Sequence, residues 1–282
     1  NKKKKFRNIK NIEAFYKKFW IKIINQSNTI VYLSFNNDLY DLNKDLSNSF
    51  SKTLLPLYIL CETIKNHNKN IKVIYLSTAS LYGNKKKLPV KENASLTLNN
   101  LYDYLKYSSE QILINSNTKN LNFQILRLSN VYGENLSSLN QSNRQILTKV
   151  IKTALTNKEI KVFGSGNYLR DFVHVKDVCE AIYKIICKKN LQNETFNIGS
   201  GKKMRLISIF KDIKHLINSN YNYSIKLKKI KLKSTNADKS NTRNFQASIL
   251  KSKIKFDWKP KISFKVGLNN LIKFIYDKKY KN

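Results

Sequence analysis

The sequence predicts an α/β protein in which a doubly wound parallel sheet is joined to a smaller C-terminal α+β lobe. Short β-branched and aromatic runs alternate with amphipathic segments of helical length. The spacing of strand, helix and strand is that of a βαβ unit, whose strands are parallel. After Gly133 this pattern changes, so we place an incomplete sheet domain in residues 1–160 and the lobe mainly in residues 161–282, with some segments returning to the first domain.

The first βαβ unit is predicted from the N-terminal part of the chain. Apolar residues at helical intervals predict an amphipathic helix over 11–25, and the run TIVYLSF (29–35) predicts a buried strand. A polar stretch then leads to a helix over 51–66, with Pro56 in its first turns, where proline is tolerated. The run KVIYLS (72–77) predicts the second buried strand.

A second cycle and a set of shorter elements follow. We expect a helix over 100–115, a strand over 123–128, a helix over 146–157, a strand over 160–163, a helix over 175–188 and an amphipathic helix over 264–276. No internal repeat is visible.

The composition is that of a globular protein. With 282 residues, 41% of them hydrophobic, the chain can bury a core. Its three cysteines, Cys61, Cys179 and Cys187, form no CxxC pair, and we expect them to be small buried hydrophobes rather than metal ligands or disulfides. No apolar run approaches the ~20 residues that cross a bilayer. We therefore expect a cytoplasmic protein that has no membrane partner and binds no metal.

The formal net charge of +35 has two interpretations. Clustered Lys and Arg side chains neutralise phosphates in nucleic-acid-binding proteins. Here the lysines occur in every segment, which is typical of a compositional bias rather than of a patch. We expect no specific nucleic-acid partner, and polyanion binding stays open as an alternative.

A group of polar side chains is predicted to converge at one end of the sheet. Tyr102 and Lys106 lie four residues apart on a predicted helix and so share one face. In a chain this rich in both types, such a pair alone is ordinary. However, a predicted strand ends about two dozen residues earlier in the hydroxyl-rich turn STASLYG (77–83), and ligands bind beyond the carboxyl ends of parallel strands.

The order of the motifs resembles that of extended short-chain dehydrogenases/reductases acting on nucleotide sugars, the NAD-dependent epimerase/dehydratase family with UDP-glucose 4-epimerase-like members. The motifs are STASLYG (77–83), Tyr102-x-x-x-Lys106-x-x-x-Glu110, LRLSNVYG (126–133), FGSGNYLRDFVHVKDV (163–178), FNIGSG (196–201) and FDWKPKISFKVGL (256–268), where Asp257 stands in place of the usual Gly. The match spans roughly residues 29–272. It implies a Rossmann-like sheet without its first strands.

The resemblance implies a catalytic set and a cofactor. Tyr102 is expected to be the general base, with Lys106 as the cation that lowers the pKa of the phenol and holds the nicotinamide ribose. Thr78 matches the residue that holds the reacting sugar hydroxyl. The implied cofactor is NAD, and NADP stays open. The expected cofactor contacts are Leu33, Ser34, Ser77, Tyr102 and Lys106.

The resemblance also implies contacts to a nucleotide-sugar substrate, made by Thr78, Asn130, Arg170 and Arg243. An Arg suits a pyrophosphate because its planar fork donates two parallel hydrogen bonds. Two structural alternatives stay open: Asn130 as a turn-forming residue, and Arg170 in a surface ion pair with Asp171 or Asp177. His174, where the family often has Tyr, is expected to be structural.

The departure that matters most is the absence of a Gly-x-x-Gly-x-x-Gly turn, which brings backbone amides to the cofactor pyrophosphate. All seven glycines lie at position 83 or later, and Met204 is the only methionine. We therefore expect a fragment, or the product of a gene with an eroded start. Without this turn, the affinity for the cofactor should fall.

The choice among reactions depends on the two residues after Thr78. Dehydratases of the family use an Asp-Glu pair there, whereas this chain has Ala79 and Ser80. The resemblance therefore favours epimerisation at C4 of a UDP-hexose or UDP-uronic acid. A keto-sugar reductase and a non-catalytic nucleotide-sugar or polyanion-binding protein remain alternatives. A homodimer formed through the helix of Tyr102 and its neighbour is implied by the same resemblance.

Overall fold

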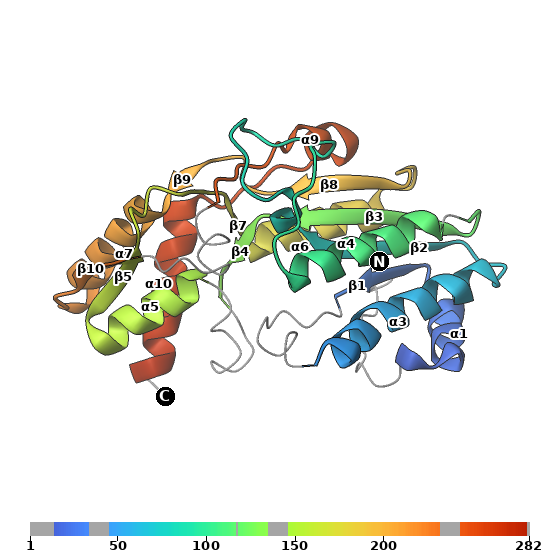
Figure 1. Cartoon of the computed structure of the whole chain (residues 1–282), viewed down its shortest axis with the longest axis horizontal. Helices are drawn as coiled ribbons and strands as arrows, with labels where there is room; N and C mark the ends of the chain where they lie inside the picture. Colours follow the sequence, from blue (N-terminus) through green and yellow to red (C-terminus); the bar gives the residue numbers. More distant parts are fainter. Residues whose placement is uncertain (1–13, 34–44, 117, 135–145, 232–242, 281–282) are drawn as a thin grey trace. The chain divides into compact units, whose positions relative to one another are not determined.

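The computed structural model describes residues 14–33, 45–116, 118–134, 146–231 and 243–280. It confirms the predicted α/β class, since helices accompany a four-stranded sheet with the order β1-β2-β3-β8 (Figure 1). The chain divides into two compact units. Unit 1 consists of Asn1–Ser77, Tyr104–Ile125 and Gln192–Glu194, and unit 2 of Thr78–Asp103, Leu126–Leu191 and Thr195–Asn282. The predicted division near residue 160 stays a prediction.

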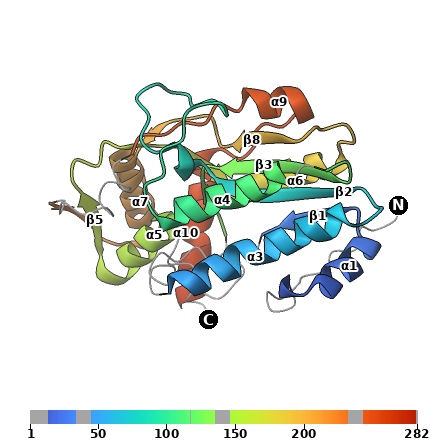
Figure 2. The same ribbon diagram turned by 45° about the vertical axis from the view of Figure 1, so that its right-hand side comes forward.

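Unit 1 contains the predicted βαβ unit. Its strands are β1 (Thr29–Tyr32), most of β2 (Ile71–Thr78) and the first part of β3 (Leu121–Leu128), and its helices are α1 (Lys17–Gln26), α3 (Leu46–Lys65) and most of α4 (Leu101–Asn115). Strands β1 and β2 are parallel, with Thr29 opposite Lys72. Helix α1 lies alongside α3 (Figure 2). The two strands and the helix that links them therefore form as the sequence predicts.

Helix α3 differs from the prediction at its start. It begins at Leu46, five residues before Ser51, because the Asp45 carboxylate accepts a hydrogen bond from the Asn48 amide at 2.9 Å and so caps the first turn. Pro56 consequently lies in the interior of the helix, not in its first turns, and its ring is buried. The core of unit 1 includes Trp20, Ile24, Leu60, Ile64 and Tyr75.

Unit 2 is built from the shorter elements that follow the first sheet strands. Its described residues form the strand pairs β4 (Asn130–Tyr132) parallel to β7 (Phe172–His174), β5 (Glu159–Phe163) parallel to β10 (Lys226–Ile230), and β6 (Leu169–Arg170) antiparallel to β9 (Met204–Arg205). The sheet strand β8 (Glu194–Ile198) belongs mostly to this unit, and its helices are η2 (Ala79–Tyr82), α5 (Ile146–Asn157), α6 (Val175–Cys187), α7 (Leu206–Tyr221), α9 (Leu250–Phe256) and α10 (Phe264–Tyr280).

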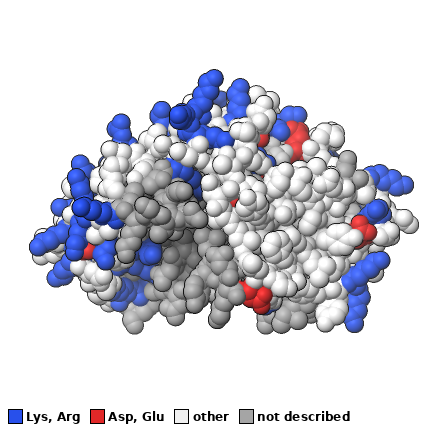
Figure 3. Space-filling model, viewed as in Figure 1, with Lys and Arg blue, Asp and Glu red and all other residues white. Residues whose placement is uncertain are grey.

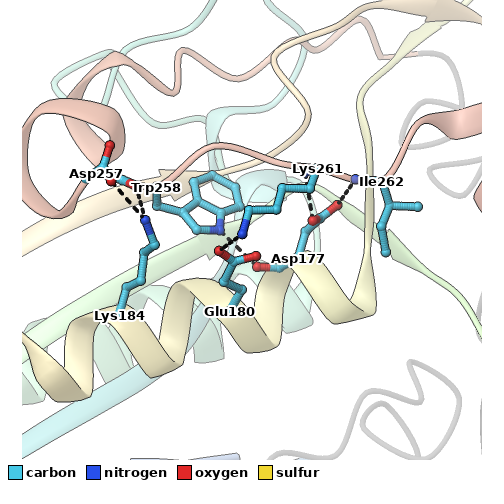
Figure 4. A network of polar contacts seen from close by, with 7 residues as sticks. All are labelled: Asp177, Glu180, Lys184, Asp257, Trp258, Lys261 and Ile262. Carbon is cyan, nitrogen blue, oxygen red and sulfur yellow. Dashed lines mark hydrogen bonds and ion pairs between the residues drawn. The ribbon is translucent and has the colours of Figure 1, made fainter.

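The core of unit 2 forms where α5, α7 and α10 pack together. Buried residues at this meeting point include Leu147, Ile151, Phe210, Ile213 and Leu271. The segment after α9 lies against α6 through Trp258, whose ring is fully buried and whose indole nitrogen donates to the main-chain oxygen of Asp177 (Figure 4). The closing segment is therefore part of the fold of this unit.

Two expectations about single side chains were wrong. Cys61 is buried, as predicted, but Cys179 and Cys187 are exposed on α6. They lie on the solvent side of a helix whose opposite side is packed, which cysteine spacing alone does not indicate.

In the described parts of the chain, every helix falls short of the length and apolarity that a membrane span needs. Figure 3 shows Lys and Arg mainly along the left, upper and right edges of the visible face, with few Asp and Glu.

Candidate active site

The candidate site begins where β2 ends. Thr78 is the last residue of the strand, and its hydroxyl accepts a hydrogen bond from the Ser80 amide at 3.1 Å, which caps the short helix η2. The Thr78 and Ser80 hydroxyl oxygens are 3.0 Å apart. Gly83 then turns the chain with φ +66°, and a Cβ there would lie 2.8 Å from Cβ of Thr97. The STASLYG motif is therefore a tight turn that fixes two hydroxyls in place.

Tyr102 meets this turn from helix α4. Its phenol and the Thr78 hydroxyl form a hydrogen bond. Although the side chain is partly exposed, burial of its hydroxyl raises the pKa of Tyr102 to about 12. The positive charge of Arg243 acts in the opposite direction, and the charge of Asp103 adds to the rise. The predicted hydroxyl and phenol are thus brought together.

Two arginines lie close to each other in the same unit. Arg170 is buried, and its Nη1 donates to the main-chain oxygens of Leu169, at 3.2 Å, and Arg243. Burial, reinforced by the positive charge of Arg243, lowers the pKa of Arg170 to about 9. Because two like charges in a poorly solvated place repel each other, an anion bound there would be stabilised. Arg170 is therefore not at the surface, where the alternative of an ion pair places it.

Asn130 is held by the backbone beside this arginine pair. It is the first residue of β4, and its side-chain amide donates to the main-chain oxygen of Asp171 at 2.9 Å. The fully buried Asp171 carboxylate accepts from the amides of Ser200 at 2.7 Å, Gly201 at 3.1 Å and Ala247 at 3.0 Å. Through these hydrogen bonds, Asp171 connects the strand segment that follows Arg170 to the FNIGSG motif (196–201) and to the segment that follows Arg243.

Lys106 lies on α4, four residues after Tyr102, and its surroundings belong to unit 1. Its Nζ donates to the main-chain oxygen of Leu76 at 2.6 Å and lies 4.9 Å from the centre of the Tyr75 ring. The side chain is 5% exposed, and burial lowers the pKa of Lys106 to about 7, against the opposing effect of Glu110. The ammonium group can therefore lose its proton near neutral pH.

The remaining predicted cofactor contacts differ in how far they are exposed to solvent. Ser77 is buried, and its hydroxyl donates to the Glu110 carboxylate at 2.5 Å. Leu33 follows β1 directly and is 63% exposed. Ser34 lies outside the described residues.

His174 has a structural position, as expected. Its Nδ1 accepts from the Lys176 amide and so caps α6, and its Nε2 lies 3.2 Å from a Glu134 carboxylate oxygen. Within the described ranges, no group of His, Cys, Asp and Glu side chains is arranged to hold a metal ion.

Two residues that the sequence did not single out lie beside the predicted set. Asp103, fully buried, accepts from the Ser80 hydroxyl at 2.5 Å. From the sequence, Ser80 was considered only because it stands where dehydratases of the family have an acidic residue. The signal available was the position of Asp103 directly after Tyr102 in the helical motif.

The comparison with known families decides the assignment. The family model described as "NAD dependent epimerase/dehydratase family" matches residues 17–199, more than half of the chain and including β2, η2 and α4. The chain belongs to this family. The match confirms the resemblance indicated by the motifs, and it includes Thr78, Tyr102 and Lys106.

Individual relatives of the family match parts of the chain. It is 34% identical over 148 residues to a putative UDP-glucose 4-epimerase of Methanocaldococcus jannaschii, covering 52% of this chain and 47% of the relative. It is 28% identical over 220 residues to an uncharacterized UDP-glucose epimerase of Bacillus subtilis, covering 77% and 64%. The aligned region therefore spans about half to just under two thirds of the length of these curated relatives.

Solved structures of family members share the fold. The UDP-glucose 4-epimerase of Thermotoga maritima, solved with UDP-glucose, superposes with a TM-score of 0.80 at 22% identity, covering 94% of this chain and 83% of the other. The UDP-glucuronic acid 4-epimerase of Bacillus cereus, in complex with UDP-glucuronic acid and NAD, gives 0.77 at 23% identity, covering 92% and 78%. At these identities the likeness shows a common Rossmann-like fold.

Proposed function

We propose that the protein is a nucleotide-sugar epimerase that acts at C4 of a UDP-hexose or a UDP-uronic acid. The observation that carries the proposal is the hydrogen bond between Thr78 and Tyr102 at the end of β2, in the same unit as the arginine pair. Relatives named as UDP-glucose 4-epimerases support the same substrate class.

NAD is the cofactor included in this proposal. The Lys106 ammonium on α4 fits its nicotinamide end, because it is a buried donor of the type that binds ribose hydroxyls. The proposed cofactor contacts remain Leu33, Ser34, Ser77, Tyr102 and Lys106. No glycine-rich turn for the diphosphate occurs among these residues, since all glycines lie at 83 or later. When bound, NAD supplies the group that takes up and returns a hydride.

The protein's own residues would move the proton. As general base, Tyr102 takes the proton of the reacting sugar hydroxyl, and Thr78 holds that hydroxyl in line with the phenol. The phenol pKa of about 12 would make this step slow at neutral pH, so positive charge is needed beside it. Arg243 already acts in that direction, and the Lys106 ammonium follows one helical turn later.

The substrate phosphates would bind at the arginine pair. Arg170 and Arg243 provide two guanidinium groups in a partly dry environment, and Asn130 adds an amide on β4. A diphosphate would relieve the repulsion between the two cations, which favours a nucleoside diphosphate over a neutral sugar.

A homodimer is proposed as well, through the outer face of α3 and α4. Exposed apolar side chains lie on both helices, including Leu55, Tyr58, Tyr104 and Ile114. A shallow groove of about 500 Å³ is lined by residues of this face and by the turn that follows α4. Light scattering should give the mass of two chains, and Tyr58→Asp should reduce it to one. A single-chain mass for the unmodified protein would exclude this dimer.

The test of the proposed activity is product formation. The protein is incubated with NAD and with UDP-glucose or UDP-glucuronic acid, and the C4 epimer is followed by NMR. Tyr102→Phe keeps the ring and removes the base, so the rate should fall by roughly 10²- to 10⁴-fold. UDP binding without epimerisation would favour the non-catalytic alternative. Oxidation of NADPH by a UDP-keto-sugar would instead identify a reductase.

A further inference from the structure

The carboxylate of Asp103 is buried directly beside the candidate base. The residue is 0% exposed and lies at the start of α4, one position after Tyr102. Its Oδ1 accepts the Ser80 hydroxyl at 2.5 Å, and its Oδ2 accepts the Asn99 amide at 3.1 Å. The charge of Asp103 also acts on Arg243 and on Tyr102. One carboxylate thus acts on the turn, the base and an arginine.

The hydroxyl groups form a chain whose direction can be worked out. A serine hydroxyl has one proton, and that of Ser80 is donated to Asp103. In the 3.0 Å contact between Ser80 and Thr78, the donor must then be Thr78. Since the Thr78 proton is used in this way, its oxygen accepts from the Tyr102 phenol. Asp103 thereby fixes the donor direction of the Ser80, Thr78 and Tyr102 hydroxyls.

We propose that Asp103 is a positioning residue of this active site, orienting the Thr78 hydroxyl through Ser80 and balancing the charge of Arg243. The inference rests on the proposed function, in which Thr78 and Tyr102 handle the sugar hydroxyl. It gives Ser80 a role as the link between a carboxylate and the reacting group. A carboxylate next to Arg243 would also compete with the substrate phosphates for the guanidinium group.

A purely structural role for Asp103 is the competing explanation. The Asn100 side chain accepts the Asp103 amide at 3.0 Å, so Asp103 is also part of the cap at the start of α4. Asn100→Ala is therefore the matched control, because it weakens the cap without touching Ser80 or Arg243. Ser80→Ala breaks the hydroxyl chain and leaves the charge of Asp103 in place.

The experiment compares Asp103→Asn, Ser80→Ala and Asn100→Ala. The groups whose charges act on Tyr102 in this unit are Asp103 and Arg243, and Lys106 follows on the same helix. In Asp103→Asn, the lost negative charge and the released Thr78 proton both favour the phenolate. The rising limb of kcat/KM should then move to lower pH by on the order of one unit. UDP should bind roughly three- to tenfold tighter, while kcat falls roughly tenfold or more.

The controls separate the two roles. Ser80→Ala should lower kcat and leave UDP affinity unchanged, and Asn100→Ala should lower only thermal stability. If Asp103→Asn weakens UDP binding or leaves the pH limb in place, Asp103 is a helix cap only.

A readout without turnover keeps this test independent of the proposed function. The ¹³Cζ signal that disappears in Tyr102→Phe reports ionisation of Tyr102, and in Asp103→Asn it should titrate at lower pH. If no epimerisation occurs in the unmodified protein but this shift is seen, the proposed activity fails and the role of Asp103 stands. An unshifted signal overturns it.

Discussion

The indole nitrogen of Trp258 donates a hydrogen bond to the main-chain oxygen of Asp177 at 3.0 Å, and the side chain of the same aspartate holds the backbone that follows (Figure 4). Its two carboxylate oxygens accept the amides of Lys261 at 2.8 Å and Ile262 at 3.2 Å. Asp177 is 2% exposed. The buried Asp177 therefore holds helix α6 to the segment before α10 through three hydrogen bonds.

Removing this carboxylate should be costly. Asp177→Ala leaves two backbone amides without their acceptor, and a buried unsatisfied polar group costs about 1–3 kcal/mol, so we expect the free energy of unfolding to fall by about 3 kcal/mol. Urea denaturation measures the loss. Glu180→Gln is the control, because the ion pair between Glu180 and Lys261 lies at the surface and should contribute little. Equal effects of the two variants would contradict this role of Asp177.

Asp257 should be replaceable by glycine with a gain in stability. It ends α9 with φ +51°, a left-handed conformation that costs a residue with a Cβ about 1 kcal/mol relative to glycine. The main-chain oxygen that Lys184 contacts is kept in the variant, and the side chain that is lost is fully exposed. Asp257→Gly should raise the free energy of unfolding by up to about 1 kcal/mol. Asp257→Val should lower it, and a loss in both variants would show that the carboxylate itself stabilises the turn.

Arg170 should contribute to binding the phosphates of the substrate and not to binding its uracil base. Arg170→Met keeps much of the apolar stem and removes the charge, so binding of UDP should weaken roughly ten- to a hundredfold. Titration calorimetry with UDP and with uridine checks this. Uridine has no phosphate, so its affinity should be the same for both proteins. A parallel loss of uridine binding would instead indicate a disturbed pocket.

The motif order predicts Thr78, Tyr102 and Lys106 as a catalytic set because their spacing along the chain reflects a local geometry. Thr78 ends a strand, and Tyr102 and Lys106 share a helix face, so a linear pattern is enough to find them. Asp103 was missed since its role depends on Ser80 and Arg243, which are distant in sequence. The exposure of Cys179 was missed for a similar reason, because burial depends on which helix face the neighbouring elements cover.

Burial of the Lys106 ammonium destabilises the folded protein. This effect should appear in the pH dependence of the free energy of unfolding. The pKa of Lys106 is about 7 in the folded protein, lowered by burial, against the ordinary value of 10.5. Between these values the unfolded chain binds the proton and the folded protein does not, so this residue makes stability rise as pH increases from about 7 to about 10.5. Below about 7 the ammonium is present in both states, and the contribution no longer changes with pH.

Lys106→Met removes this contribution and keeps a side chain of similar length. Relative to the unmodified protein, the variant should gain stability most at and below neutral pH and least in alkaline solution, because only the buried ammonium is unfavourable. Urea denaturation at a series of pH values measures the difference, which removes the titration of all other groups from the comparison. A difference that is constant with pH would mean that Lys106 keeps an ordinary pKa in the folded protein. In that case the ammonium would be a permanent charge on α4.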